Sequence, residues 1–259
     1  MKQKRNFILV ILIAILAISI IDRFFYSYDG KNTVARVIDG DTIELSNGSM
    51  IRYIGVNTPE IRRKAGEEWV YDPMPYAEKA KDFNEGKVLG RQIDIEYDIQ
   101  RKDKYGRILG YVYIGNIMVN AELIKNGYSV IYSYPPNIKH LDDFLNAQEE
   151  ARVNKRGIWK DLEDNIISSK EAKDNFGLIK MIDTDIVNTY ISEKVLILRC
   201  PDDFNIVIFR SNFNLFPKDA IRSPDSYFRY KRIKVYGLIR EHKKKPEIIV
   251  YHPSQFEVI

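Results

Sequence analysis

Apolar and polar residues alternate over residues 34–45 and again over residues 50–56. Alternation with a period of two is typical of strands that bury one face. A serine, an asparagine and a glycine occupy residues 46–48 between the two runs, and these residue types favour a tight turn. The pattern therefore predicts a β-hairpin at the start of the globular part.

Apolar residues recur with the period of two of a strand or the period of 3.6 of a helix as far as Trp159. Gly90 and Gly157 follow runs with helical spacing, as expected at helix ends. The order of elements predicts a small α+β domain over residues 33–160, built on a five-stranded barrel with helices. The expected elements after the first hairpin are a mobile surface loop at 61–74, a helix at 76–89, a strand at 92–98, a hairpin at 108–118, a helix at 120–126, an aromatic strand at 128–134 and a helix at 140–156.

From residue 177 onward, short strand-like runs follow one another without a long helix between them. This pattern predicts a second small barrel or sandwich over residues 177–259, similar to an OB-fold. The charged stretch 161–176 is expected to be a helical linker. The fold class is thus α+β and mostly β. The expected strands lie at 178–182, 195–200, 205–210, 232–240, 247–251 and 256–259.

A continuous apolar run at residues 7–21 follows the basic residues Lys2, Lys4 and Arg5. This arrangement is typical of a signal peptide or a signal anchor. The run is apolar on every face, which argues against a buried core helix. No small-x-small cleavage pattern follows it, so we predict a transmembrane anchor at residues 1–26, with a cleaved leader and secretion as the alternative. The positive-inside rule then places the rest of the chain outside the membrane.

The composition permits nucleic acid as a partner and excludes some classes of site. The net charge is +4, and hydrophobic residues make up 45% of the chain, enough for proper cores. Cys200 is the only cysteine, so an intramolecular disulfide and a cysteine-based zinc centre are excluded. Its apolar neighbours predict that Cys200 is a buried strand residue.

The first hairpin also concentrates groups suited to phosphodiester chemistry. Oxygen ligands for a hard cation, a guanidinium and a spare carboxylate are the parts that this chemistry needs. A cation and guanidiniums offset the charge of the phosphate and stabilise the more highly charged transition state. Any one of these residues alone is more often a surface charge, and Asp39 is as well explained as a turn residue. The residues that the hairpin brings near one end are Asp39, Asp41, Arg52, Asn57, Thr58 and Glu60.

At these residues the chain resembles the staphylococcal nuclease-like (thermonuclease) family. The resemblance rests on several pieces in the family's order and at its approximate spacing, which together cover residues 33–159. They are Val-Ile-Asp-Gly-Asp-Thr at 37–42, Arg52, Val-Asn-Thr-Pro-Glu at 56–60, Asp-Lys-Tyr-Gly-Arg at 103–107, Val-Asn at 119–120 and Gly-Ile-Trp at 157–159.

The resemblance implies an OB-fold barrel and a Ca²⁺-dependent phosphodiesterase that acts on DNA and RNA, cleaves the 5′ P–O bond and leaves 3′-phosphates. Asp41 matches a calcium ligand, and Thr58 matches the residue that offers a backbone carbonyl. Glu60 matches the carboxylate that positions or deprotonates the attacking water. The arginines that hold the phosphate correspond to Arg52 and Arg107, and the aromatics near the bound nucleotide correspond to Tyr111, Tyr113, Tyr132 and Tyr134.

Asn57 departs from the family pattern, because the best-known member has a second aspartate ligand at this position. An asparagine still offers a carbonyl oxygen to Ca²⁺ but removes one negative charge. Weaker ion binding is the hypothesis that follows. Asn57 is also the one feature that favours a rival reading, a non-catalytic nucleic-acid-binding protein on a degenerate nuclease scaffold.

The closing part of the chain combines basic residues with interleaved tyrosines and a phenylalanine. Such a mixture suits phosphate contacts and base stacking on single strands, and the run resembles the end of a nucleic-acid-binding OB-fold. A solvated basic hairpin and a surface that docks protein or lipid are the alternatives. The candidate binding residues are Lys231, Arg232, Lys234, Lys243 and Lys244.

The sequence as a whole predicts a nuclease that is anchored in the cell membrane or secreted, uses Ca²⁺ and cuts DNA, RNA or both endonucleolytically. No other cofactor is expected, and the chain is expected to be a monomer.

Overall fold

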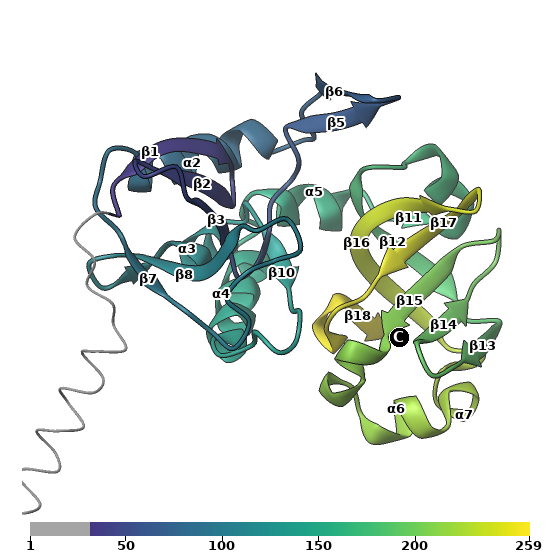
Figure 1. Cartoon of the computed structure of the whole chain (residues 1–259). Helices are drawn as coiled ribbons and strands as arrows, with labels where there is room; N and C mark the ends of the chain where they lie inside the picture. The colour runs from purple at the N-terminus through teal and green to yellow at the C-terminus, as the bar shows by residue number, and fades with distance from the viewer. Residues whose placement is uncertain (1–31) are drawn as a thin grey trace, which may run out of the picture.

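The computed structural model describes residues 32–259. The predicted membrane anchor at residues 1–26 lies outside this range. Within the range, no helix is both long and apolar enough to cross a membrane. The described chain forms two β-rich parts that follow one another in sequence, the first drawn from purple to teal and the second from green to yellow (Figure 1).

The first part is built on a sheet with the strand order β1-β2-β3-β8-β7, to which β9 is added beside β8. The first three strands are antiparallel neighbours, whereas β3 and β8 run parallel, with Ile51 opposite Ile108. The strands are β1 Val34–Asp39, β2 Thr42–Leu45, β3 Met50–Tyr53, β7 Asp94–Glu96, β8 Ile108–Ile114 and β9 Ile117–Met118.

These strands do not close into the predicted barrel. An isolated bridge between Thr33 and Gln92, rather than a ladder, joins the start of β1 to the chain before β7. β7 is only three residues long, which leaves little backbone for a further ladder. At Gly55, with φ 79°, the chain leaves β3 and enters β4 (Gly55–Asn57), which pairs with β10 (Val130–Tyr132) as a separate ribbon. The fold is therefore OB-like and β-rich with added helices, but the sheet is open.

Helices complete the hydrophobic core of the first part. They are α2 (Ala77–Val88), α3 (Val119–Lys125) and α4 (Leu141–Val153), close to the predicted ranges. Buried Asn120 ties this core to the sheet, because its side-chain nitrogen donates to the Ile54 carbonyl at 2.8 Å and its oxygen accepts from the Val112 amide at 2.9 Å.

The stretch 61–74, predicted to be an irregular loop, contains a β-hairpin. β5 (Arg62–Ala65) and β6 (Glu68–Tyr71) pair with each other and project from the body of the first part (Figure 1). All four residues of β6 are exposed, so the strand has no buried face. A strand without a buried face needs no alternation of apolar and polar residues, and for this reason the hydrophobic pattern did not predict it.

The second part contains a sheet with the order β11-β12-β16-β17-β15-β14-β13, and β18 pairs with β16. The eleven-residue strand β16 is central, because it pairs with β12, β17 and β18. No ladder closes this sheet into a barrel within residues 32–259. The strands are β11 Ile167–Ser168, β12 Ile179–Asp185, β13 Asn188–Ile191, β14 Val195–Arg199, β15 Asn205–Phe209, β16 Arg232–His242, β17 Lys245–Ile249 and β18 Phe256–Val258.

The predicted linker at 161–176 is an ordered piece of the fold. It comprises the end of α5 (Ile158–Asp164), strand β11 and the 3₁₀-helix η1 (Ser169–Asp174), and β11 joins the second sheet beside β12. Three further short helical segments fill the connection between β15 and β16. They are η2 Arg210–Leu215, α6 Lys218–Arg222 and α7 Pro224–Phe228, and η3 Pro253–Gln255 precedes β18.

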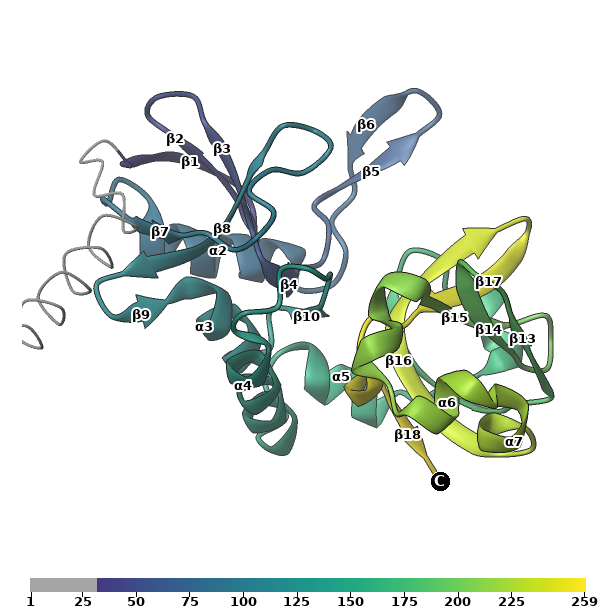
Figure 2. The same ribbon diagram turned by 60° about the horizontal axis from the view of Figure 1, so that its bottom comes forward.

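An apolar contact holds the two parts together. Trp159 of α5 is fully buried and packs edge-on against Tyr236 of β16, with ring centroids 4.9 Å apart. Met181 of β12 and Val130 of β10 belong to the same buried cluster. The side of β16 that carries Tyr236 therefore faces the first part, and both views show α5 between the two parts (Figures 1 and 2).

Candidate active site

The turn between β1 and β2 places a carboxylate against Thr58. A Cβ added at Gly40 would lie 2.7 Å from the Thr58 Cγ2 atom, so only glycine permits this approach. Asp41 is 5% exposed, and its Oδ2 accepts from the Thr58 amide at 2.8 Å and from the Thr58 hydroxyl at 3.1 Å. The structure thus brings together two of the predicted cation ligands.

Arg52 extends from β3 to the same carboxylate. Its Nη2 lies 3.2 Å from the Asp41 Oδ2, and its Nη1 donates to the Tyr53 carbonyl at 2.8 Å. Nη2 also lies 3.4 Å from the Asn57 Oδ1, so the third predicted ligand belongs to this group. The guanidinium side chain is 14% exposed, which leaves an edge open to a substrate.

Glu60 follows Thr58 and Pro59 at the entrance to the β5–β6 hairpin. The Met74 amide donates to the Glu60 carbonyl at 2.9 Å and fixes the backbone there. The side chain is exposed, yet burial of its carboxylate raises the pKa of Glu60 above the ordinary value, and the charge of Asp41 raises it further. Arg52 and Arg107 oppose the shift, which places both arginines within electrostatic range of Glu60.

Arg107 ends the turn that precedes β8. Asp103 holds this turn, because its Oδ1 accepts from the Tyr105 and Arg107 amides at 2.9 and 3.0 Å while its Oδ2 accepts from the Arg107 Nε at 2.7 Å. Burial alone would raise the pKa of Asp103, but these hydrogen bonds from Arg107 and Tyr105 outweigh it and hold the pKa below its ordinary value. The motif at 103–107 is therefore a self-bonded turn that presents one arginine.

The acidic groups of the site fit a hard cation. Burial and the neighbouring charge of Asp41 raise the pKa of Asp39, although the Asp41 amide donates to the Asp39 Oδ1 at 3.0 Å. Two carboxylates repel each other here with Arg52 as the opposing charge, and a cation would relieve that repulsion. Within residues 32–259 no cluster of three or more His, Cys, Asp or Glu residues is placed to hold a metal. Neutral oxygens, such as those of Asn57 and Thr58, would have to complete the ligand set.

The predicted nucleotide-binding tyrosines separate into two groups. Half-buried Tyr132 ends β10 and exposed Tyr134 follows it, with parallel rings whose centroids are 6.1 Å apart. Tyr111 is fully buried, packs edge-on against His140, and donates its hydroxyl to Asp98 at 2.8 Å. Helix α4 covers this face of β8, so Tyr111 belongs to the core and cannot stack on a base.

Tyr105 is an aromatic residue that the sequence reasoning missed. Its side chain is 73% exposed, and the Arg107 guanidinium lies 5.6 Å from its ring. The sequence feature that could have identified Tyr105 is its position inside the motif at 103–107, between Asp103 and Arg107.

The predicted basic residues of the second part do not form one patch. Arg232 and Lys243 lie near opposite ends of β16, a strand of eleven residues that spans roughly 35 Å at about 3.3 Å per residue. Arg232 forms a two-bonded ion pair with Asp183 at 2.8 and 3.1 Å. Lys234 stands in register between Asp183 on β12 and Glu257 on β18, Lys231 lies over the Tyr227 ring, and Lys243 and Lys244 form the turn before β17.

A pair of carboxylates, of which Asp41 is buried and Asp39 half-buried, lies with two arginines and an exposed glutamate on an OB-like fold. This set defines the class of the protein as a phosphodiester hydrolase. The family model described as staphylococcal nuclease homologue matches residues 50–161, which carry most of this site. The thermonuclease of Staphylococcus hyicus is 38% identical over 129 residues, covering 49% of this chain and 73% of that protein. The thermonuclease of Staphylococcus intermedius is 38% identical over 130 residues, covering 49% and 74%.

Endonuclease YncB of Bacillus subtilis (strain 168) is 39% identical over 132 residues, covering 49% of this chain and 60% of that protein. The chain belongs to the staphylococcal nuclease-like family, and it is a nuclease that hydrolyses phosphodiester bonds. The matching family model ends at residue 161, before the second sheet begins.

Proposed function

We propose that this nuclease depends on Ca²⁺ and cuts internal phosphodiester bonds of DNA, RNA or both. The observation that carries the proposal is the contact of Arg52 with both Asp41, at 3.2 Å, and Asn57, at 3.4 Å. These residues come from three separate elements, so the fold, and not local sequence, assembles them. Charged residues that only face solvent are normally exposed, whereas Asp41 of this set is buried.

The side chains have separate roles in this proposal. Arg52 and Arg107 bind the non-bridging oxygens of the scissile phosphate in the planar geometry that guanidinium favours. Glu60 orients the attacking water and accepts its proton. A raised pKa makes Glu60 a stronger base than an ordinary glutamate, which suits that task. Asp103 acts by holding Arg107 in place.

Asp41, Thr58 and Asn57 would hold the cation, with Asp39 beside them. A bound Ca²⁺ would offset the negative charge that accumulates on the phosphate during water attack. Asn57 supplies a neutral oxygen where a second carboxylate would bind Ca²⁺ more strongly, so we expect a weak calcium site.

The rival function is a degenerate scaffold that binds nucleic acid without cutting it. Arg52 contacts both Asp41 and Asn57, and Glu60 nearby in the chain is exposed. A complete set of catalytic residues favours an active enzyme. The similarity to a thermonuclease and to an endonuclease also favours catalysis.

A calcium titration of cleavage tests the metal proposal. Asn57→Asp restores a charged ligand, and we expect the half-activating Ca²⁺ concentration to fall by roughly tenfold or more, since each extra carboxylate tunes calcium affinity. Asn47→Asp adds the same charge in the exposed turn before β3 and is the matched control. Equal midpoints for the wild type and Asn57→Asp would show that Asn57 is not a ligand.

We further propose that residues 1–26 place the enzyme at the cell membrane with its catalytic part outside, or release it if they are cleaved. We also propose that the second part is an OB-fold-like module that binds nucleic acid. Fractionation of cells that produce the full chain tests the first statement. Recovery of the uncleaved chain in the cytosolic fraction would contradict both locations.

A further inference from the structure

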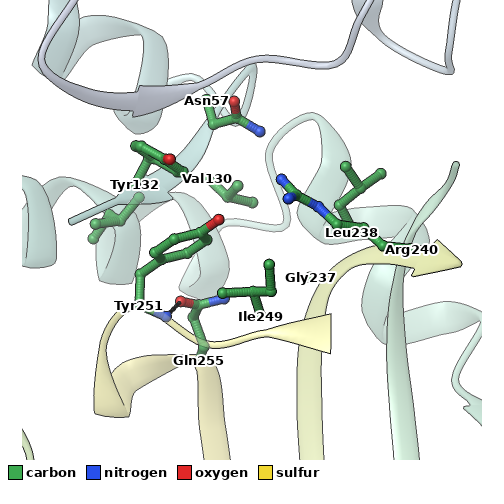
Figure 3. A pocket seen from close by; sticks show the side chains of 10 residues that line it. Asn57, Val130, Tyr132, Gly237, Leu238, Arg240, Ile249, Tyr251 and Gln255 are labelled. Carbon is green, nitrogen blue, oxygen red and sulfur yellow. Dashed lines mark hydrogen bonds between the residues drawn. The ribbon is translucent and has the colours of Figure 1, made fainter. Parts of the chain in front are cut away.

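A narrow gap separates the first part from the second beside the active site. Asn57, Val130 and Tyr132 line it from one side, and Gly237, Leu238, Arg240, Ile249, Tyr251 and Gln255 line it from the other (Figure 3). The gap adjoins a wider groove of about 490 Å³, which shares Tyr132, Arg240 and Tyr251 with it. A groove of this size lies within the range of ligand-binding clefts.

The narrow gap adjoins the proposed catalytic centre at Asn57. Asn57 lines the gap, and its Oδ1 lies 3.4 Å from the Nη2 of Arg52. Arg240 lines the same gap from the second part (Figure 3). A chain of nucleotides bound at Arg52 would therefore pass within reach of the second part.

Arg240 is positioned by the strand that carries it. Side chains alternate along β16, so Tyr236, Leu238 and Arg240 lie on the same side of the strand. Tyr236 is fixed against Trp159 in the apolar contact between the two parts. The side chain of Arg240 is exposed and directs its guanidinium into the gap (Figure 3). Among residues 32–259 no carboxylate lies within 4.0 Å of it to form an ion pair.

Aromatic rings cover the floor between Arg240 and the first part. The ring of Tyr251 lies 4.4 Å from that of Tyr132, which in turn is parallel to Tyr134. Tyr134 is 50% exposed, so one face of this set is open to a base. The arrangement is held across the two parts, because the Asn212 side chain donates to the Ser133 carbonyl at 2.9 Å and to the Tyr251 carbonyl at 2.7 Å.

Positive charge dominates the wider groove. Lys194, Arg210 and Arg240 line it, against one carboxylate, Glu193. Arg210 is held to this wall by a hydrogen bond from its Nη1 to the Glu193 carbonyl at 3.3 Å. Stacking surfaces next to cations are the combination by which proteins bind single-stranded nucleic acid.

We propose that the second part supplies a subsite for the nucleotides that flank the scissile phosphate of a single strand. Arg240 binds a flanking phosphate, and Tyr132, Tyr134 and Tyr251 provide the surface on which the bases stack. Lys194 and Arg210 extend the phosphate track along the groove. This inference rests on the proposed nuclease function. It implies that the second part makes the enzyme prefer longer single strands, which reach the subsite, over short ones.

Two substrates separate this subsite from the catalytic centre. Arg240→Ala in the full chain is expected to raise KM for a single-stranded octanucleotide roughly tenfold with kcat little changed, because one charge-assisted contact is lost. Hydrolysis of bis(4-nitrophenyl) phosphate, which has no flanking phosphate, should be unchanged. Arg222→Ala, which removes an exposed arginine of α6 that does not line the groove, is the matched control.

Equilibrium binding keeps the test independent of catalysis. Anisotropy of a labelled octanucleotide in the presence of a chelator should show affinity roughly tenfold weaker for Arg240→Ala, and a slope of log K against log salt reduced by about 0.7. Wild-type binding without cutting under Ca²⁺ would refute the proposed function and leave the subsite standing. Equal affinities for the wild type and Arg240→Ala, or equal losses on both substrates, would overturn the subsite.

Discussion

Asn212 is the polar link between the two parts, and its removal tests whether they act as one unit. The residue lies in η2 and is 1% exposed, with its amide nitrogen shared between the Ser133 and Tyr251 carbonyls. Asn212→Ala removes both donors and leaves two carbonyls without these partners. Only the bond to Ser133 crosses between the parts, and its loss costs about 1 kcal/mol net, so we expect the contact to weaken by about 1 kcal/mol. That corresponds to roughly a fivefold change in the docking equilibrium.

Trp159 provides the assay, because it is fully buried between the two parts. The chain has two tryptophans, and the other, Trp69, is 65% exposed on β6. In a Trp69→Phe background, the emission of Trp159 during urea titration reports the loss of this contact. A change of about 1 kcal/mol should lower the midpoint by about 0.5 M urea at a slope near 2 kcal/mol/M. Asn214→Ala, an exposed position of the same 3₁₀-helix, is the control. Coincident midpoints for Asn212→Ala and Asn214→Ala would refute the reasoning.

Two further predictions concern stability and reactivity. Burial raises the pKa of the Cys200 thiol to about 12, so at pH 8 the native chain should not react with a thiol reagent such as Ellman's reagent, whereas the unfolded chain should react with one equivalent. The stability that this neutral thiol contributes to the fold is present below pH 9 and is lost as the pH rises towards 12. Rapid labelling of Cys200 in the native chain would contradict its burial. Gly127 has φ 70°, and an added Cβ would lie 2.0 Å from the Arg156 carbonyl oxygen, so Gly127→Ala should lower Tm sharply. Gly48→Ala, at φ 82° with open space around the added Cβ, should cost only about 1–2 kcal/mol of backbone strain, and similar Tm values for the two variants would contradict the close packing at Gly127.

Much of the first part could be predicted because its signals are local. The helix expected at 76–89 is observed as α2, and Gly90 follows it with φ 70°. The strands from β1 to β3 fall within the alternating runs at 34–45 and 50–56, and β4 extends one residue beyond the second run. Turn residues and periodicity act over a few residues, so the sequence states them directly.

The central residues of the candidate site could also be predicted, but the sequence could not show which neighbouring residues lie outside it. Asp41, Arg52 and Asn57 are brought together as expected. Tyr111 alternates correctly in β8, yet α4 covers the side of the strand on which it lies. A strand with both faces covered carries no sequence signal that tells a buried tyrosine from a binding one.

Arg240 could not be predicted because its role depends on docking. It lies far along the chain from Glu60, and the contact of Trp159 with Tyr236 helps to fix its side of β16 towards the first part. The sequence itself shows only a density of basic residues. That density includes Arg232, which is already paired with Asp183 at the other end of the strand.

Digestion of single-stranded DNA by the full chain, with Ca²⁺ and with a chelator, tests the proposed chemistry most directly. We expect cutting in Ca²⁺ alone, and a loss of roughly 10²–10⁴-fold in kcat for Glu60→Gln, the range for a general base. Glu67→Gln, an exposed glutamate in the turn of the neighbouring hairpin, should cut like the wild type. Undiminished cutting by Glu60→Gln, or cutting that persists in the chelator, would contradict a Ca²⁺-dependent reaction with Glu60 as its base.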